Sequence, residues 1–233
     1  MKKIILMLVT VLVTASYAFA IPSLQLDVSG GTYDVATETT VANSNVFDLY
    51  ALLQVSNKTP ITERYYISAA LTPKTGFTTN GIDVGSFSFN GTTINATRDM
   101  VYGVPPLETN LAFTSGDLSK HNIYETYFAE FSFLFDATQV NAYNTIDGSA
   151  ATGMLNQKTF TIDLSNLADG YGIHFDLYSE STRNGDISID KFAPFSHDAE
   201  GTHITTVPEP GTVMLFGIGM FGLAIFGKRK MYN

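Results

Sequence analysis

The stretch YETYFAEFSFLF, residues 124–135, indicates the fold class. Apolar side chains recur at every second position of this stretch, at Tyr127, Ala129, Phe131, Phe133 and Phe135. The residues between them are mostly polar, although Phe128 and Leu134 are not. Successive side chains of a strand point to opposite faces of a sheet, so this period of two predicts a strand with one buried and one wetter face.

Similar patterns recur along the chain. The clearest is VFDLYALLQV, residues 46–55, where every second residue is again apolar. Shorter runs rich in β-branched and aromatic residues lie at 24–28, 64–71, 85–90, 160–164, 172–178 and 186–189. Gly, Asn, Asp, Pro and Thr separate these runs, as expected for the turns of an all-β protein.

These runs predict a single β-sandwich domain, jelly-roll-like, over residues 21–201. No amphipathic helical period extends over ten or more residues of this body, which argues against βαβ units and a Rossmann or barrel enzyme. Residues 137–158 fit either a long loop or a short helix. The chain has no cysteine, which excludes disulfides and thiol chemistry, so the fold must depend on its apolar core.

The first 20 residues have the three parts of an export signal. Lys2 and Lys3 are positive, Ile4 to Val13 form an apolar region in which only Thr10 is polar, and Ala18-Phe19-Ala20 fits the A-x-A cleavage rule. This predicts a signal peptide over residues 1–20 and a mature chain that starts at Ile21, with Ala18 and Ala20 at the cleavage site. The apolar run is short for a membrane span, which disfavours an uncleaved anchor.

The other end of the chain has the pattern of a membrane segment. Residues 211–227 form a run of 17 without a charged side chain, which predicts a short transmembrane helix. Lys228, Arg229 and Lys230 follow it, and such basic residues favour the cytoplasmic side, so residues 228–233 form a cytoplasmic tail and the body lies opposite. In the linker, residues 202–210, two prolines favour an extended, accessible peptide.

Three ordered parts of this end resemble a known signal. They are Val207-Pro208-Glu209-Pro210, the apolar helix and the basic tail, and together they resemble the PEP-CTERM sorting signal of Gram-negative bacteria. The resemblance implies that exosortase, a membrane-embedded cysteine transpeptidase, recognises Pro-Glu-Pro and removes the helix. The protein would pass transiently through the inner membrane to the envelope surface or extracellular matrix. The alternative is a plain C-terminal anchor, in which Glu209 is a solvated loop residue.

The mature body is strongly acidic. Residues 21–210 contain eight of the 13 basic residues and all 22 acidic ones, which leaves a charge of −14. Such a surface repels phosphate backbones and anionic lipids, so nucleic acid is not expected as a partner. Divalent cations and neutral glycans are better suited to it.

The body has no recognisable catalytic motif. Glu125 and Glu130 are five positions apart, so on one strand they point to opposite faces and cannot act as an acid and base pair. The sequence contains no G-x-S-x-G elbow and no glycine-rich phosphate loop. We therefore expect no enzyme activity.

Three segments could hold a cation. In NGDISID, oxygen side chains alternate on one strand face as calcium ligands could, although Ile189 stands where an EF-hand-like loop needs Gly; they are Asn184, Asp186, Ser188 and Asp190. His197, Asp198 and His203 lie close enough in sequence to converge, without a known zinc spacing. His174 shares a strand face with Asp176, as a paired edge histidine or a ligand. The simpler interpretation of all three segments is polar surface.

Two further segments resemble a family of bodies. LQLDVSGGTYD, residues 24–34, and KFAPFSHDAEG, residues 191–201, are similar to the bacterial surface proteins named choice-of-anchor N. This resemblance implies an exported domain without an assigned activity, and it brings no catalytic residues with it.

The leading functional hypothesis is an exported, non-enzymatic surface or matrix protein. The sorting signal implies an association with exopolysaccharide and biofilm. The alternative is a lectin-like or carbohydrate-active sandwich, because exposed aromatic rings can stack on sugars. The tyrosines that motivate it, most of which we expect in the core or at its edges, are Tyr50, Tyr65, Tyr66, Tyr102, Tyr124, Tyr127, Tyr171 and Tyr178.

Overall fold

The structure, a computed structural model, describes residues 21–73, 82–105, 125–183, 186–205 and 220. By its internal contacts the chain divides into the units Met1–His203 and Ile204–Asn233. All the strands described below belong to the first unit.

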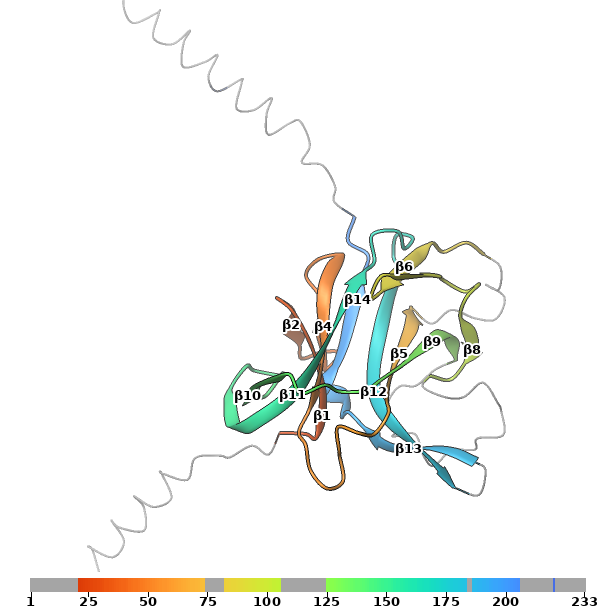
Figure 1. Cartoon of the computed structure of the whole chain (residues 1–233). Helices are drawn as coiled ribbons and strands as arrows, with labels where there is room; N and C mark the ends of the chain where they lie inside the picture. Colours follow the sequence, from red (N-terminus) through yellow and green to blue (C-terminus); the bar gives the residue numbers. More distant parts are fainter. Residues whose placement is uncertain (1–20, 74–81, 106–124, 184–185, 206–219, 221–233) are drawn as a thin grey trace, which may run out of the picture. The chain divides into compact units, whose positions relative to one another are not determined.

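One sheet has six strands, in the order β1-β4-β11-β6-β7, with β10 paired to β11 (Figure 1). Every pairing in it is antiparallel. The strands are β1 (Leu24–Val28), β4 (Val46–Leu53), β6 (Ser86–Phe89), β7 (Thr92–Asn95), β10 (Gln139–Tyr143) and β11 (Ala150–Asp163).

The second sheet has eight strands, in the order β2-β3-β14-β12-β5-β9-β8, with β13 paired to β12. Only β14 and β3 pair in parallel among them. The strands are β2 (Thr32–Asp34), β3 (Thr39–Val41), β5 (Tyr65–Thr72), β8 (Val101–Gly103), β9 (Thr126–Phe133), β12 (Gly172–Arg183), β13 (Asp186–Phe192) and β14 (Asp198–Thr202). A 3₁₀ turn, η2 (Phe195–His197), leads into β14.

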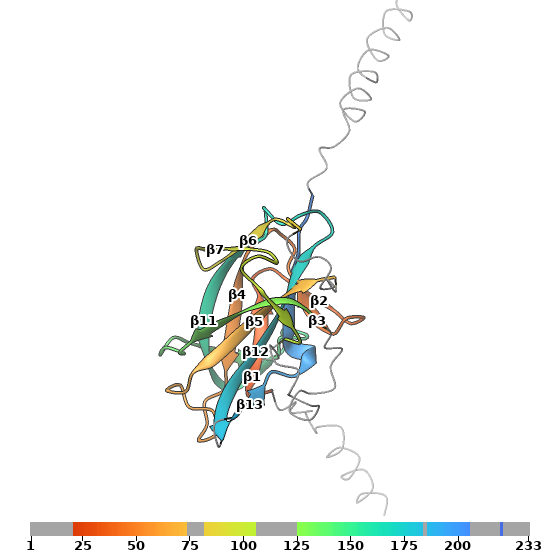
Figure 2. The same cartoon turned by 90° about the vertical axis from the view of Figure 1, so that its right-hand side faces the viewer.

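The core lies between the two sheets. Buried side chains that belong to one contiguous cluster come from both of them, for example Leu26, Leu49, Ile162, Ile67, Phe175 and Leu177. Aromatic rings also meet across the sandwich: Phe47 lies edge-on to Phe175 with centroids 6.4 Å apart. In both views β4 runs beside β11 and β5 beside β12 (Figures 1 and 2). The predicted sandwich is confirmed, while its jelly-roll-like variant stays a prediction.

The strand that indicated the fold class is β9. Tyr127 is buried in the core, and Phe131 and Phe133 pack against it from partly buried positions. Phe128 points to the other face and is also buried, at 1% exposure. The first half of this strand is therefore buried on both faces, whereas the alternation alone predicts one solvent-exposed face.

Residues 137–158, for which a loop or a helix was expected, contain β10 and the first part of β11, which pair as an antiparallel hairpin. Ala142 and Leu155 of this hairpin form a second apolar cluster with Leu52, and Ile21 packs against it. The other residues of the hairpin that pack in this cluster are Val140, Tyr143 and Ala151.

Several predicted segments lie outside the described residues. They are the signal peptide at 1–20, the end of the linker, the transmembrane helix at 211–227 apart from Met220, and the basic tail at 228–233. Within the part of the chain that the structure describes, no helix has the length and apolar character needed to cross a bilayer.

Candidate functional site

The outer face of the eight-stranded sheet, turned away from the core, carries the main cluster of ionisable groups. Ile173, Phe175 and Leu177 of β12 are in the core, so the alternate residues His174, Asp176 and Tyr178 face outward. The antiparallel register places Glu200 of β14 opposite His174, and Ser68 of β5 opposite Asp176.

His174 is surrounded by three carboxylates. Its Nε2 lies 3.4 Å from Asp176 Oδ1 and 3.8 Å from Asp198 Oδ2. Its Nδ1 lies 3.8 Å from Glu200 Oε2. The pairing of His174 with Asp176 is the one that their shared strand face predicted. Asp198 joins them from β14, and we call these four residues the His174 cluster.

The His174 cluster is largely removed from water. The Asp176 and Asp198 side chains are 7% and 0% exposed, while those of His174 and Glu200 are 19% and 26% exposed. The Ser68 hydroxyl donates a 2.9 Å hydrogen bond to Asp176 Oδ2, which leaves Oδ1 on the side of the histidine. Solvent therefore reaches the cluster from the side of His174 and Glu200.

Electrostatics in this cluster favour the imidazolium. Burial disfavours the charged ring, but the carboxylates of Asp176, Asp198 and Glu200 outweigh burial and hold the pKa of His174 well above its ordinary value of 6.5. The three carboxylates thus favour the positively charged form of the His174 ring.

The nitrogen and oxygen atoms of this cluster could also hold a metal ion. One ligand atom each from His174, Asp176 and Asp198 lie within 4.8 Å of one another. Two of the three segments that the sequence predicts as possible cation sites contribute to this geometry. One supplies His174 and Asp176, and the segment that contains His197 supplies Asp198.

The remaining residues of the His197 segment go elsewhere. His197 is buried in η2, where its Nδ1 lies 2.9 Å from Ser196 Oγ, and desolvation lowers its pKa to about 4. His203 Nε2 lies 3.3 Å from Asp169 Oδ1, and its Nδ1 lies 3.0 Å from the Leu164 carbonyl. The structure therefore brings Asp198 to His174, while the contacts of His197 and His203 described here are with other groups.

Residues 186–190 of the NGDISID segment belong to β13, which pairs antiparallel with β12. Asp190 Oδ2 lies 2.5 Å from Lys191 Nζ, and the same ammonium lies 2.9 Å from Glu63 Oε2. The Lys191 ammonium group thus lies beside Asp190, where the sequence pattern suggests a calcium ion. The side chains of Asp186 and Ser188, and the whole of Asn184, lie outside the described parts of the chain.

Two further carboxylates, Glu130 and Glu180, lie near each other on the same outer face. Glu130 accepts a hydrogen bond from the Tyr178 hydroxyl, and Tyr178 stacks on Tyr66 with ring centroids 5.6 Å apart. Burial is the main cause that raises the pKa of Glu130 and of Glu180. Glu125, by contrast, accepts a 3.3 Å bond from Tyr102, so Glu125 and Glu130 have separate partners.

The tyrosines offer little open ring surface. Among those that motivated a sugar-binding function, Tyr65, Tyr127 and Tyr178 are buried, and Tyr50, Tyr66, Tyr102 and Tyr171 are of intermediate exposure. Tyr124 lies outside the described residues.

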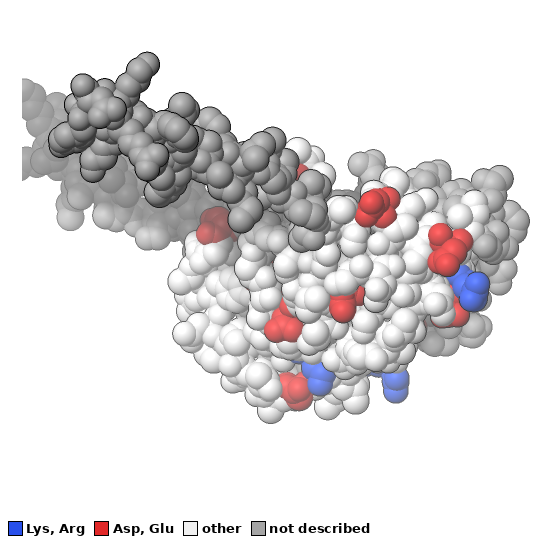
Figure 3. Space-filling model, turned by 90° about the horizontal axis from the view of Figure 1, so that it is seen from above, with Lys and Arg blue, Asp and Glu red and all other residues white. Residues whose placement is uncertain are grey.

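Figure 3 shows acidic side chains in several separate places on the face it presents.

The comparisons with known proteins concern the C-terminal end. Residues 206–230 match the PEP-CTERM protein-sorting motif. The chain thus carries the signal by which exosortase sorts proteins to the cell surface. Neither a curated protein nor a solved structure matches the chain. The similarity of the body to the choice-of-anchor N proteins finds no support in these comparisons and stays a prediction.

Proposed function

We propose that this chain is an exported, non-enzymatic surface or extracellular-matrix protein that exosortase cuts near Pro208-Glu209-Pro210. The observation that carries the proposal is the sorting motif at residues 206–230. The export signal predicted at residues 1–20 supports it, because the two signals bracket the sandwich and require passage through the inner membrane.

The acidic body suits a role outside the cell. A surface with a charge of −14 over residues 21–210 stays soluble and repels anionic lipid, so we expect the released protein to leave the membrane. Its expected partners are the secretion machinery, exosortase and neutral or cation-bridged exopolysaccharide of a biofilm matrix.

Intact mass and cell fractionation test this proposal in strains with and without exosortase. The expected product of the complete strain starts at Ile21, ends near the Pro-Glu-Pro motif and is found outside the inner membrane. Glu209→Ala should leave the full C-terminus in place, while Lys58→Ala, at an exposed position of the body, should be processed normally. A product that keeps Lys230 and stays in the inner membrane in both strains would show a permanent anchor instead.

The alternative is a lectin-like or carbohydrate-active protein. The observation that favours it is the half-exposed Tyr66, stacked on Tyr178 beside Glu130, because an aromatic ring next to carboxylates is a common sugar contact. Glycan arrays and matrix pull-downs with the released protein test it. Binding no stronger than that of a denatured control, or binding that Tyr66→Ala leaves unchanged, would contradict it.

A further inference from the structure

We propose that His174, Asp176 and Asp198 bind one divalent transition-metal ion, with Zn²⁺ as the best fit. This site does not depend on the sorting function, and the three residues come from the two paired strands β12 and β14. The sequence alone divides them between two separate segments.

The spacing of the ligand atoms fits a metal ion. Nitrogen and oxygen ligands at about 2.0–2.2 Å from a tetrahedral zinc ion are separated by about 3.3–3.6 Å. His174 Nε2 lies 3.4 Å from Asp176 Oδ1 and 3.8 Å from Asp198 Oδ2. These two distances are within a few tenths of an ångström of that range, and all three ligand atoms lie within 4.8 Å of one another.

The neighbours of these ligands hold them in a suitable orientation. Metal-binding histidines usually turn their second ring nitrogen toward a carboxylate, which fixes the tautomer and the ring plane. Glu200 stands in this place, 3.8 Å from His174 Nδ1. Ser68 holds the far oxygen of Asp176 at 2.9 Å, so that Oδ1 remains directed at the histidine.

The type of ligand selects the class of ion. Calcium and magnesium prefer an all-oxygen shell, whereas imidazole favours zinc and its transition-metal neighbours. Two carboxylates and one imidazole leave a fourth position for water, on the side where His174 is 19% exposed. The ion would supply positive charge between the two carboxylates, and it would tie β14 to β12 in a protein without disulfides.

Metal titration of the full chain tests the site. The protein is purified in detergent without a histidine tag, stripped with EDTA and titrated with ZnCl₂ by calorimetry. We expect one zinc ion per chain, and at least tenfold weaker binding for His174→Gln and for Asp198→Asn. Glu200→Gln, at a partly exposed side chain, should weaken binding by about 10- to 100-fold through loss of histidine orientation. His203→Gln is the matched control, since His203 contacts Asp169 instead, and its affinity should equal that of the unmodified chain.

Thermal unfolding in EDTA shows whether each variant folds. X-ray absorption of the zinc-loaded unmodified chain gives a readout that needs no variant, and one imidazole with oxygen neighbours is expected. Three results would overturn the proposal: no saturable binding below about 100 µM, equal affinity for folded His174→Gln and His203→Gln, or a zinc shell without imidazole. Tighter binding of Ca²⁺ than of Zn²⁺ would also overturn it.

Discussion

The Tyr178 hydroxyl on β12 donates a hydrogen bond to the Glu130 carboxylate on β9, across the intervening strand β5. Although the Glu130 side chain is partly exposed, desolvation by its neighbours raises its pKa, the bond from Tyr178 opposes this, and the neighbouring charge of Glu180 adds to the rise. The outer face of the sheet therefore holds a carboxylate that folding makes harder to ionise.

The first prediction follows from the sign of this shift. A carboxyl group whose pKa is higher in the folded state contributes stability that is complete below its unfolded pKa, near 4.5, and is lost as pH rises through the folded pKa. We expect Glu130→Gln, which keeps an acceptor for Tyr178, to gain stability over the unmodified chain as pH rises above 4.5. Urea unfolding at several pH values measures the difference. Glu125→Gln is the control, and a difference that shrinks as pH rises would contradict this account.

The second prediction concerns the contact of β14 with the core. A methyl group at Gly201 would lie 2.7 Å from Leu164 Cδ1 and 2.8 Å from the Phe47 ring. We expect Gly201→Ala to lower the free energy of unfolding by about 1–3 kcal/mol through overpacking. Denaturant unfolding measures it, and adding Phe47→Leu should recover part of the loss. If Gly201→Ala is as stable as the unmodified chain, Leu164 and Phe47 can move aside without a loss of stability, which would contradict the prediction.

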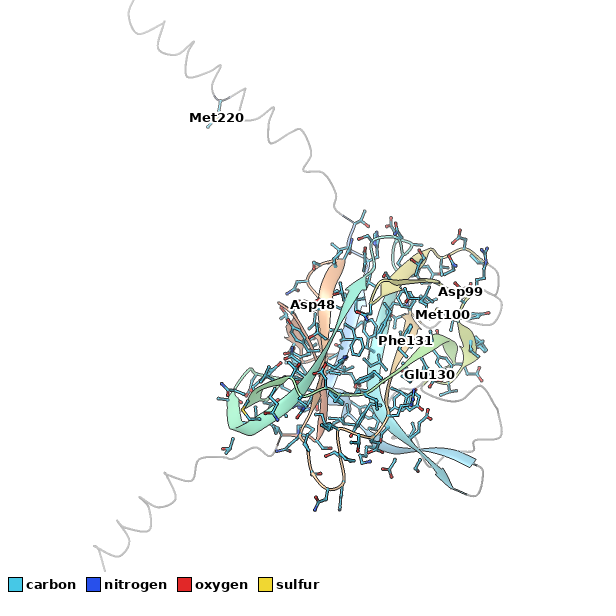
Figure 4. All side chains as sticks on the ribbon, in the orientation of Figure 1. Asp48, Asp99, Met100, Glu130, Phe131 and Met220 are labelled. Atoms are coloured by element: carbon cyan, nitrogen blue, oxygen red, sulfur yellow. The ribbon has the colours of Figure 1, made fainter. Side chains whose placement is uncertain are left out.

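The third prediction tests the packing between the sheets. The Phe89 ring on β6 and the Phe131 ring on β9 lie parallel with centroids 3.9 Å apart (Figure 4 labels Phe131). A double-mutant cycle of Phe89→Leu and Phe131→Leu should give a coupling energy of about 0.5–1.5 kcal/mol. Phe89→Leu with Phe192→Leu serves as the control pair and should be additive, because Phe192 contacts the rings of Tyr178 and Phe195. If the stability losses of Phe89→Leu and Phe131→Leu are additive, the two rings do not stabilise each other and the prediction is wrong.

The fourth prediction concerns the hairpin of β10 and β11. The Tyr143 hydroxyl donates a 2.7 Å hydrogen bond to Asp27 Oδ2, and burial raises the pKa of Asp27. Tyr143→Phe leaves this half-buried carboxylate without one donor, so we expect a loss of about 1–3 kcal/mol at neutral pH. The loss should diminish in acid, where Asp27 is protonated. Thermal unfolding at both pH values measures it, with Tyr50→Phe as the control, and a loss that does not depend on pH would contradict the role of the carboxylate.

Local patterns predicted much of the fold. The runs at 24–28, 46–55, 64–71 and 172–178 coincide with β1, β4, β5 and most of β12, because alternation depends only on neighbours in sequence. The pattern failed for β14, whose residues DAEGT include types that strands usually avoid. This strand nevertheless lies inside the eight-stranded sheet, between β3 and β12.

The sequence by itself determined the class of fold and the sorting signal. Alternation marks strands, and a short sorting motif is recognised as a linear peptide, so neither needs a long-range contact to be identified. Only the tertiary structure decided that Asp198 meets His174, 24 positions earlier, and that Glu130 meets Tyr178. These contacts depend on which strands pair and in what register, and that choice is made by the packing of the whole core rather than by neighbouring residues.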